Sequence, residues 1–289
     1  MDQIAVNGKT RSLQEVKEEH LTNMLSQMRN NFPEAIHAYE YVRTLLRYKK
    51  TIPGLQISFL APEGDFRLGV LFFLIDGEDF VGSIYCEDEE ARQAMEEALV
   101  STTLNVPFKK MTLLSGMTNN SYLAAKPLID SKGWSVLGGI MYWMPWQTAR
   151  QITVNLPEGV EIRKLNREHA ELVNKEWPHN YPGSQAMIER QLEFNFGLGV
   201  FRGDHLLSWA VHFFYGGVGA VQTLKSEGRK GYAKAVVQAI SKKLGEMEID
   251  VHLNVVVGNE PAEAFFKALG FEIAYNCEWA MDGMFNKLH

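Results

Sequence analysis

The stretch that most constrains this chain runs from Gln222 to Ala235, where an apolar segment gives way to a basic turn and then to a helical pattern. The turn reads Ser-Glu-Gly-Arg-Lys-Gly over residues 226–231, and apolar side chains recur at helical spacing from Ala233 to Leu244. A strand that ends in such a turn directs unpaired backbone N–H groups and the positive end of a helix dipole at one spot, and Gly231 lets a ligand approach closely. The stretch predicts a phosphate site, although an ordinary turn also fits these residues taken alone.

Length and charge bound the rest of the interpretation. The 289 residues are long for one domain and comfortable for two. The net charge of −6 argues against nucleic acid or an acidic membrane surface as the main partner. Two cysteines, Cys86 and Cys277, fit neither a disulfide framework nor a zinc site, so we predict no metal and a reducing compartment.

The N-terminal residues 1–8 resemble neither a signal peptide nor a transit peptide, and no apolar stretch of 18 residues occurs. We therefore expect a cytoplasmic protein without a membrane partner.

Hydrophobic periodicity predicts an α/β chain in two parts. In the first part we expect helices over 11–29 and from Pro33 to Leu46, strands at 56–60, 68–75 and 80–85 with a turn at 76–79, a helix over 87–99, a strand at 110–115, a short helix over 123–129 and a strand ending at Met144. Residues 146–162 show little periodicity and predict a linker. In the second part we expect helices over 166–177 and 184–194, the second capped by Ser184, then strands at 199–202, 206–214 and 219–224, the helix after the basic turn, and a strand over 251–257.

A second motif follows that last strand. Asn259 can cap a helix with Pro261 in its first turn, and Ala262, Phe265 and Phe266 fall on its apolar face. Together with the basic turn upstream, this order resembles the GNAT superfamily of acyl-CoA N-acyltransferases. The resemblance implies that the turn cradles the cofactor pyrophosphate and that the Asn-x-x-Ala helix borders the pantetheine arm.

A narrower resemblance covers roughly residues 160 to 280. The run from His169 to Trp177, Ser184-Gln185, Trp209, Thr223-Leu224 and Cys277-Glu278-Trp279 look like the matching regions of glycine N-acyltransferases. A mitochondrial location is possible by this resemblance. The implied cofactor-binding residues are Val221, Gln222, Thr223, Arg229, Lys230, Gly231, Tyr232, Ala233, Lys234, Asn259 and Phe266.

Three positions depart from the family patterns. Gly228 stands where the superfamily usually has Gln or Arg, Gly217 stands where glycine N-acyltransferases have a glutamate proposed as the general base, and Phe266 replaces a tyrosine that many members use as a general acid. The catalytic residues are therefore unknown. His212 and Tyr215 on the preceding strand, and Tyr275 and Glu278 on the following one, are candidates, while packed strand residues remain the alternative for each. His252 reads as a core histidine, and we expect Glu227 to face solvent.

The end of the first part repeats the pattern of the second. Leu113-Leu114-Ser115, Asn119-Asn120, a helix, Gly133-Trp134 and a strand ending at Met144 parallel the run from Val255 to Met281. The first copy has no counterpart of the basic turn, so we interpret it as a degenerate copy. Two unrelated α/β stretches are the alternative.

We predict two GNAT-like domains, 1–150 and 151–289, each with a mixed central sheet flanked by helices, the second binding acyl-CoA. The expected activity is N-acyl transfer to a small amine such as glycine or another amino acid, by direct attack on the thioester. A catalytically silent acyl-CoA-binding or protein-interaction module is the alternative. The oligomeric state is left open.

Overall fold

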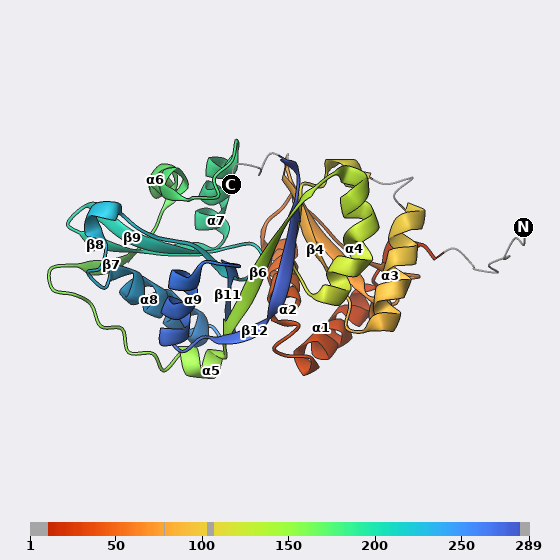
Figure 1. The fold of residues 1–289 in the computed structure, drawn as a ribbon, viewed down its shortest axis with the longest axis horizontal. Coiled ribbons are helices and arrows are strands. Elements are labelled where there is room, and N and C mark those ends of the chain that lie inside the picture. Colours follow the sequence, from red (N-terminus) through yellow and green to blue (C-terminus); the bar gives the residue numbers. More distant parts are fainter. Residues whose placement is uncertain (1–10, 78, 103–106, 284–289) are drawn as a thin grey trace, which may run out of the picture.

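The computed structural model describes residues 11–77, 79–102 and 107–283 (Figure 1). Our expectations for residues 1–8, and for Glu78 in the predicted turn, lie outside these ranges.

The two parts of the chain follow one order of elements, as the predicted repeat requires. The first part contains β1 (Leu13–Glu15), α1 (Leu21–Asn30), α2 (Ile36–Thr51), β2 (Gln56–Pro62), β3 (Val70–Asp76), β4 (Asp79–Tyr85), α3 (Glu89–Thr102), β5 (Leu113–Met117), α4 (Asn119–Lys132) and β6 (Ser135–Met144). The short helix α5 (Trp146–Ala149) then leads to the second part, which contains β7 (Glu161–Lys164), α6 (Ala170–Glu176), α7 (Ser184–Phe194), β8 (Phe196–Arg202), β9 (His205–His212), β10 (Val218–Thr223), α8 (Tyr232–Glu246), β11 (Val251–Val256), α9 (Glu260–Ala268) and β12 (Glu272–Met281). Short 3-10 helices lie at Glu18–His20, Phe66–Leu68, Pro107–Lys110, Arg167–His169 and Lys225–Glu227.

Four local expectations were wrong, and one is the linker over 146–162, which contains α5 and the start of β7. Residues 11–29 do not form one helix, because Leu13–Glu15 pairs with β2 as an edge strand before α1 begins. The short helix over 123–129 is the longer α4, since the Thr118 hydroxyl accepts the Ser121 N–H at its start and Gly133 ends it in the left-handed conformation. Gly183 precedes α7, and the Ser184 hydroxyl is bonded to Tyr181 and Asn174 instead of capping the helix.

The final strands of the two parts are exchanged. The larger sheet has the order β1-β2-β3-β4-β5-β12-β6-β11. β12 runs antiparallel between β5 and β6, and β6 in turn pairs antiparallel with β11. Each part therefore completes its sheet with the last strand of the other, and β6 and β12 lie side by side at the centre of the molecule (Figure 1).

A second sheet has the order β10-β9-β8-β7. β10 is its edge strand and forms no ladder with β11, which belongs to the larger sheet. The corresponding strands of the first part, β4 and β5, are paired in parallel at Val81↔Leu113 and Gly82↔Leu114. The sheet is thus closed in the first part and open between β10 and β11 in the second.

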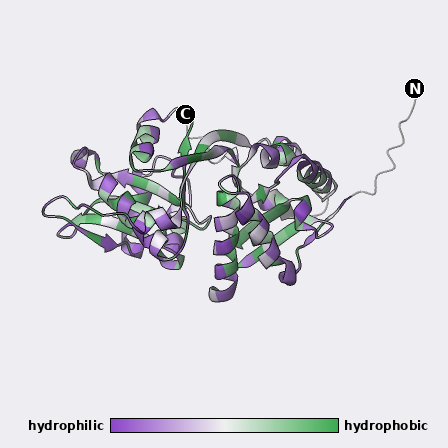
Figure 2. Cartoon of the chain, turned by 90° about the horizontal axis from the view of Figure 1, so that it is seen from below, coloured by the Kyte–Doolittle hydropathy of each residue, from purple (hydrophilic) through white to green (hydrophobic). Residues whose placement is uncertain are grey.

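The largest apolar cluster lies where the two parts meet. It joins Tyr41 and Phe72 of the first part to Trp209 and Phe213 of the second. A second cluster lies around α8 and α9 and includes Tyr142 of β6, and a third lies around α3 and α4. Figure 2 shows hydrophobic bands along the strands of both lobes and hydrophilic bands on the helices. In the ranges that the structure describes, no helix combines the length and apolar character needed to cross a membrane.

Candidate functional site

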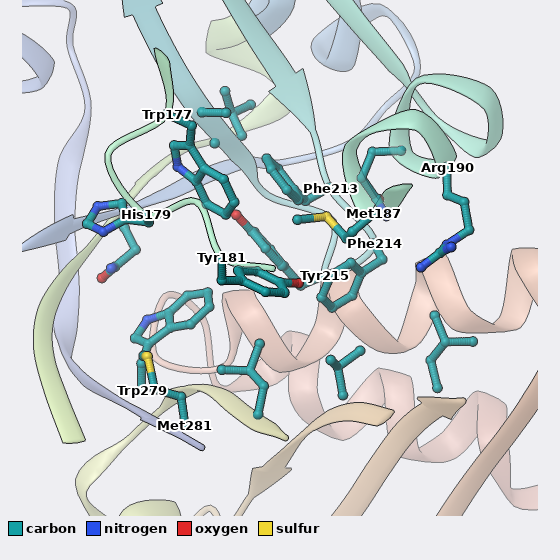
Figure 3. A pocket seen from close by; sticks show the side chains of 18 of the residues that line it. Trp177, His179, Tyr181, Met187, Arg190, Phe213, Phe214, Tyr215, Trp279 and Met281 are labelled. Carbon is teal, nitrogen blue, oxygen red and sulfur yellow. The ribbon is translucent and has the colours of Figure 1, made fainter. Parts of the chain in front are cut away.

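A cavity of about 190 Å³ lies between the two parts of the chain (Figure 3). Its lining is mostly apolar and aromatic, and three groups of residues contribute to it. The second part supplies Trp177, His179, Tyr181, Met187, Arg190, Gln191, Phe213, Phe214, Tyr215, Val218, Gly219, Ala220, Asn254 and Val256; the first part supplies Leu74, Asp76, Val81, Leu113 and Leu137; the exchanged β12 supplies Trp279 and Met281.

The cavity reaches β10 at a β-bulge. The register passes from Gly219↔Val211 to Gln222↔Trp209, so two residues of β10 stand opposite one of β9. Ala220, the first of the two, has φ +47°, a conformation that non-glycine residues rarely adopt. The outward N–H and C=O groups of this edge strand face the opening toward β11 and are not used by a sheet partner there.

The basic turn follows directly after β10, as predicted. Gly231 has φ +84° and precedes α8, and no side chain caps the first turn of this helix. The N–H groups at the start of a helix have no intrahelical partner, so α8 offers free donors. Arg229 and Lys230 are exposed beside them. The expectation that Glu227 faces solvent was wrong, because its carboxylate lies 3.0 Å from Nζ of Lys230 and 3.6 Å from Nη2 of Arg202.

The other sequence-predicted cofactor residues lie on both sides of the opening. Val221, Gln222 and Thr223 are half-buried on β10, and Gln222 Nε2 donates to the Glu176 carbonyl. Tyr232 is buried, and its hydroxyl accepts a 2.6 Å hydrogen bond from Arg202. Ala233 and Lys234 continue the first turn of α8. On the β11 side, Asn259 caps α9 by accepting the Ala262 N–H at 3.3 Å, and Phe266 is buried under that helix.

Of the four candidate catalytic residues, Tyr215 alone lines the cavity. It follows β9 in a turn instead of lying on the strand. A Cβ on Gly219 would lie 2.8 Å from its hydroxyl oxygen, which places that oxygen over β10 next to the bulge. Burial raises the pKa of Tyr215, so its hydroxyl stays protonated and can donate a hydrogen bond.

The remaining three candidates lie away from the cavity. His212 is buried at the end of β9, where Nε2 lies 3.0 Å from the Gly216 carbonyl, and burial lowers its pKa to about 4. Tyr275 donates its hydroxyl to the Gly116 carbonyl at 2.9 Å. Glu278 is half-buried with a raised pKa, pairing in register with Met117 and Gly138. Tyr275 and Glu278 are also separated from β11 by the intervening β6.

The space beside Gly217, where the resemblance expects a glutamate, is filled by two rings. A Cβ there would lie 2.7 Å from Cε2 of Tyr215 and 2.9 Å from Nε2 of His252. The His252 Nε2 lies 3.2 Å from Nδ1 of His37, whose Nε2 lies 3.0 Å from Oγ of Ser115. His252 is thus a core histidine as expected, but its Nδ1 is not satisfied by any group in the described part of the chain.

Sequence reasoning missed the polar groups that do reach the cavity. His179 lies on the wall with its ring edge-on to Trp177, and burial lowers its pKa. Its Nδ1 is buried and has no partner among the described residues. Arg190 of α7 forms a 2.7 Å ion pair with Asp76 of β3. The only sequence feature that could have identified His179 is the aromatic, proline-flanked turn at 177–183.

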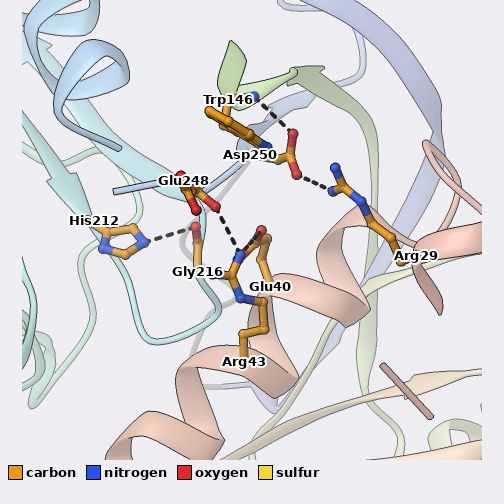
Figure 4. A network of polar contacts seen from close by, with 8 residues as sticks. All are labelled: Arg29, Glu40, Arg43, Trp146, His212, Gly216, Glu248 and Asp250. Atoms are coloured by element: carbon orange, nitrogen blue, oxygen red, sulfur yellow. Dashed lines mark hydrogen bonds and ion pairs between the residues drawn. The ribbon is translucent and has the colours of Figure 1, made fainter. Parts of the chain in front are cut away.

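Polar contacts also join the two parts on the side of α2, from Arg29 to Asp250 and from Arg43 to the Glu248 carbonyl (Figure 4). Asp250 is buried, pairs with Arg29 and accepts the Trp146 N–H at 3.0 Å. Glu40 is buried beside Arg43, with Nη1 to Oε1 at 2.9 Å, and burial raises the pKa of Glu40 to about 7. Within the described ranges, no cluster of three or more His, Cys, Asp or Glu side chains has a geometry that could hold a metal ion.

Comparisons with known proteins agree with this architecture. Residues 197–280 match the family model of FR47-like protein. No curated protein matches the chain. An X-ray structure of a Drosophila protein is similar over 94% of this chain and 98% of its own, with a TM-score of 0.79 and 21% identity.

Two further similar solved structures are GNAT proteins. A GCN5-related N-acetyltransferase from Sphaerobacter thermophilus has a TM-score of 0.53 and 13% identity, covering 94% of this chain and 95% of its own. A tandem GNAT protein from the clavulanic acid biosynthesis pathway has a TM-score of 0.51 and 12% identity, covering 93% of this chain and 97% of its own. The fold is therefore the GNAT fold in a two-domain arrangement, and the fold class predicted from the sequence is confirmed.

Proposed function

We propose that this protein transfers an acyl group from acyl-CoA to a small amine by direct attack of the amine on the thioester. The observation that carries the proposal is the unpaired edge of β10, which leads from the cavity at Val218–Ala220 to the uncapped N-terminus of α8. An edge strand can hydrogen-bond the amides of a pantetheine arm as it would a neighbouring strand. The helix N-terminus with Arg229 and Lys230 then suits the pyrophosphate.

The chemistry proposed for the cavity needs no covalent enzyme intermediate. Backbone N–H groups at the bulge of β10 would polarise the thioester carbonyl, and the amine nitrogen would form the new bond as the CoA thiolate leaves. The amine must lose a proton, and we assign this step to neutral His179. Tyr215 would donate a hydrogen bond to the reacting group beside Gly219.

The finer assignments are part of the same proposal. We keep the domain bounds 1–150 and 151–289, the cofactor residues predicted from the sequence, and a cytoplasmic location. Glycine or another amino acid is the acceptor suggested by the resemblance to glycine N-acyltransferases. A silent acyl-CoA-binding or interaction module is the second candidate, favoured by the rings that fill the space beside Gly217.

One experiment separates the two candidates. The protein is incubated with acetyl-CoA or longer acyl-CoAs and a panel of amines that includes glycine, and release of free thiol is followed. Acceptor-dependent release supports the transferase. CoA binding without release on any acceptor supports the silent acyl-CoA-binding module, and absence of CoA binding contradicts the transferase and leaves only the interaction module.

A further inference from the structure

One wall of the cavity comes from the domain that lacks the basic turn. Leu74 of β3 pairs with Val81 of β4, Val81 pairs with Leu113 of β5, and Leu113 pairs with Met281 of the exchanged β12. All four side chains line the cavity. They form one continuous row across four neighbouring strands, here called the apolar row.

The backbone under the apolar row is fixed. β3, β4, β5 and β12 are joined by ladders on every side, including the parallel pairing that closes β4 against β5. Unlike β10 and β11, which form no ladder with each other, these four strands leave no unpaired edge under the apolar row. The volumes of its four side chains therefore limit the size of the group that fits.

The cavity's size and polarity indicate the group it takes. A cavity of about 150 Å³ accommodates benzene, so the 190 Å³ here suit one aromatic ring with a short link. Trp177 and Phe213 face the same space (Figure 3). The Arg190 guanidinium is already paired with Asp76, so it does not favour a charged ligand end.

We propose that the apolar row makes the first domain the specificity wall of the site, selecting a substrate that carries one aromatic ring or a branched aliphatic group of similar volume. This inference rests on the proposed acyl transfer. The ring can be carried by the acyl group or by the amine, and the experiment has an arm for each source.

The test compares Val81→Ala and Val81→Leu with Val70→Ala. Val70 lies on β3, is buried in the same apolar cluster as Val81 and does not line the cavity, so its truncation removes the same atoms from the same cluster. One arm varies the acyl group from acetyl to benzoyl to naphthoyl with a fixed amine. The other varies the amine from methylamine to benzylamine to naphthylmethylamine with a fixed acyl-CoA.

Val81→Ala should shift kcat/KM about tenfold from the one-ring toward the two-ring substrate, and Val81→Leu should shift it toward the smallest one. The shift should appear in one arm only, which identifies the source of the ring. Val70→Ala should keep the wild-type preference. Unchanged preference in both arms for both Val81 variants, or the same change in Val70→Ala, overturns the proposal.

A readout without turnover keeps this proposal separate from the activity. Binding of N-benzylacetamide, a neutral one-ring amide, is measured by NMR titration on the folded variants. In one outcome, thiol release is absent while Val81→Leu weakens this binding about tenfold and Val70→Ala does not. That result supports the specificity wall and contradicts the proposed acyl transfer. If the Val81 variants bind the probe as the wild type does, the wall is wrong whatever the activity.

Discussion

His179 is suited to remove a proton because its imidazole is neutral at the cavity wall. Burial lowers its pKa below 6.5, and its Nδ1 has no partner within the described residues. A base acts in its unprotonated form, so the rate should fall with decreasing pH only below about pH 6.5. We expect His179→Gln to lower kcat about 10²- to 10⁴-fold and to abolish this acidic limb, measured as thiol release between pH 4.5 and 8.

The control for His179 is His205→Gln, which changes an exposed histidine on β9. Tyr215→Phe tests the second polar group and should lower kcat while leaving the acidic limb in place, because the Tyr215 hydroxyl stays protonated. An acidic limb that persists in His179→Gln would contradict the assignment of the base.

At the scale of elements, the basic turn and the first turn of α8 form the proposed pyrophosphate site. Replacing Arg229 and Lys230 together by Glu places two negative charges beside the free N–H groups of this helix. We expect CoA binding, measured by calorimetry at low salt, to weaken at least about tenfold, and the difference to shrink as salt is added. Glu227→Gln should strengthen binding, because Glu227 holds Lys230 and Arg202 and repels phosphate.

The matched control replaces Lys49 and Lys50 by Glu, two exposed lysines at the end of α2. This double variant changes the net charge equally but lies on another element. If both double variants bind CoA with the same affinity, the turn is not the pyrophosphate site.

The elements that the sequence predicted well are those with a local cause. Gly231 adopts the left-handed conformation that the turn requires, and Asn259 caps α9 through its side chain, as the pattern indicated. The helix predicted over residues 11–29 was wrong at its start, because Leu13–Glu15 forms an edge strand by pairing with β2, a distant segment. The sequence indicated a strand around Tyr275 and Glu278 but not which strands it pairs with, so the exchange with β6 could not be predicted.

The same reason limited the prediction of the site. The basic turn is contiguous in sequence and its position before α8 was predicted. The cavity instead combines His179, Leu74, Val81 and Trp279 from distant segments. The expectation that the first domain is a degenerate copy accounts for its closed β4–β5 pair but gave no indication of its contribution to the cavity. Tyr275 and Glu278 were considered as catalytic candidates because the sequence did not show that β12 is exchanged with β6.

At the scale of the whole molecule, strand exchange and a shared core make the two domains interdependent. β12 completes the sheet of the first domain, and β6 completes that of the second. The largest apolar cluster contains residues of both domains. Buried ionisable groups from both domains therefore contribute to a single free energy of unfolding. His37 and Glu40 come from the first domain, and His212 and His252 come from the second.

The pH dependence of that stability follows from these four groups. Burial lowers the pKa of His37 to about 3, of His212 to about 4, and of His252 well below its ordinary value, so folding becomes less favourable as pH falls below 6.5. Glu40 acts in the opposite sense, because its pKa is raised to about 7 and its contribution is lost as pH rises from 4.5 to 7. Between pH 5 and 6.5, the effect of the three histidines on the free energy of unfolding is larger than the opposing effect of Glu40.

We therefore expect the free energy of unfolding to increase from pH 5 to pH 6.5 by on the order of 2 kcal/mol per pH unit, measured by urea denaturation at constant ionic strength. Glu40→Gln removes the opposing group and should steepen this increase by about 1 kcal/mol per pH unit, while the exposed Glu18→Gln should leave it unchanged. Because both domains share the core, the fluorescence of the tryptophans and the far-UV signal should change in one transition. A stability that is flat over this range would mean that the histidines are not buried as neutral groups.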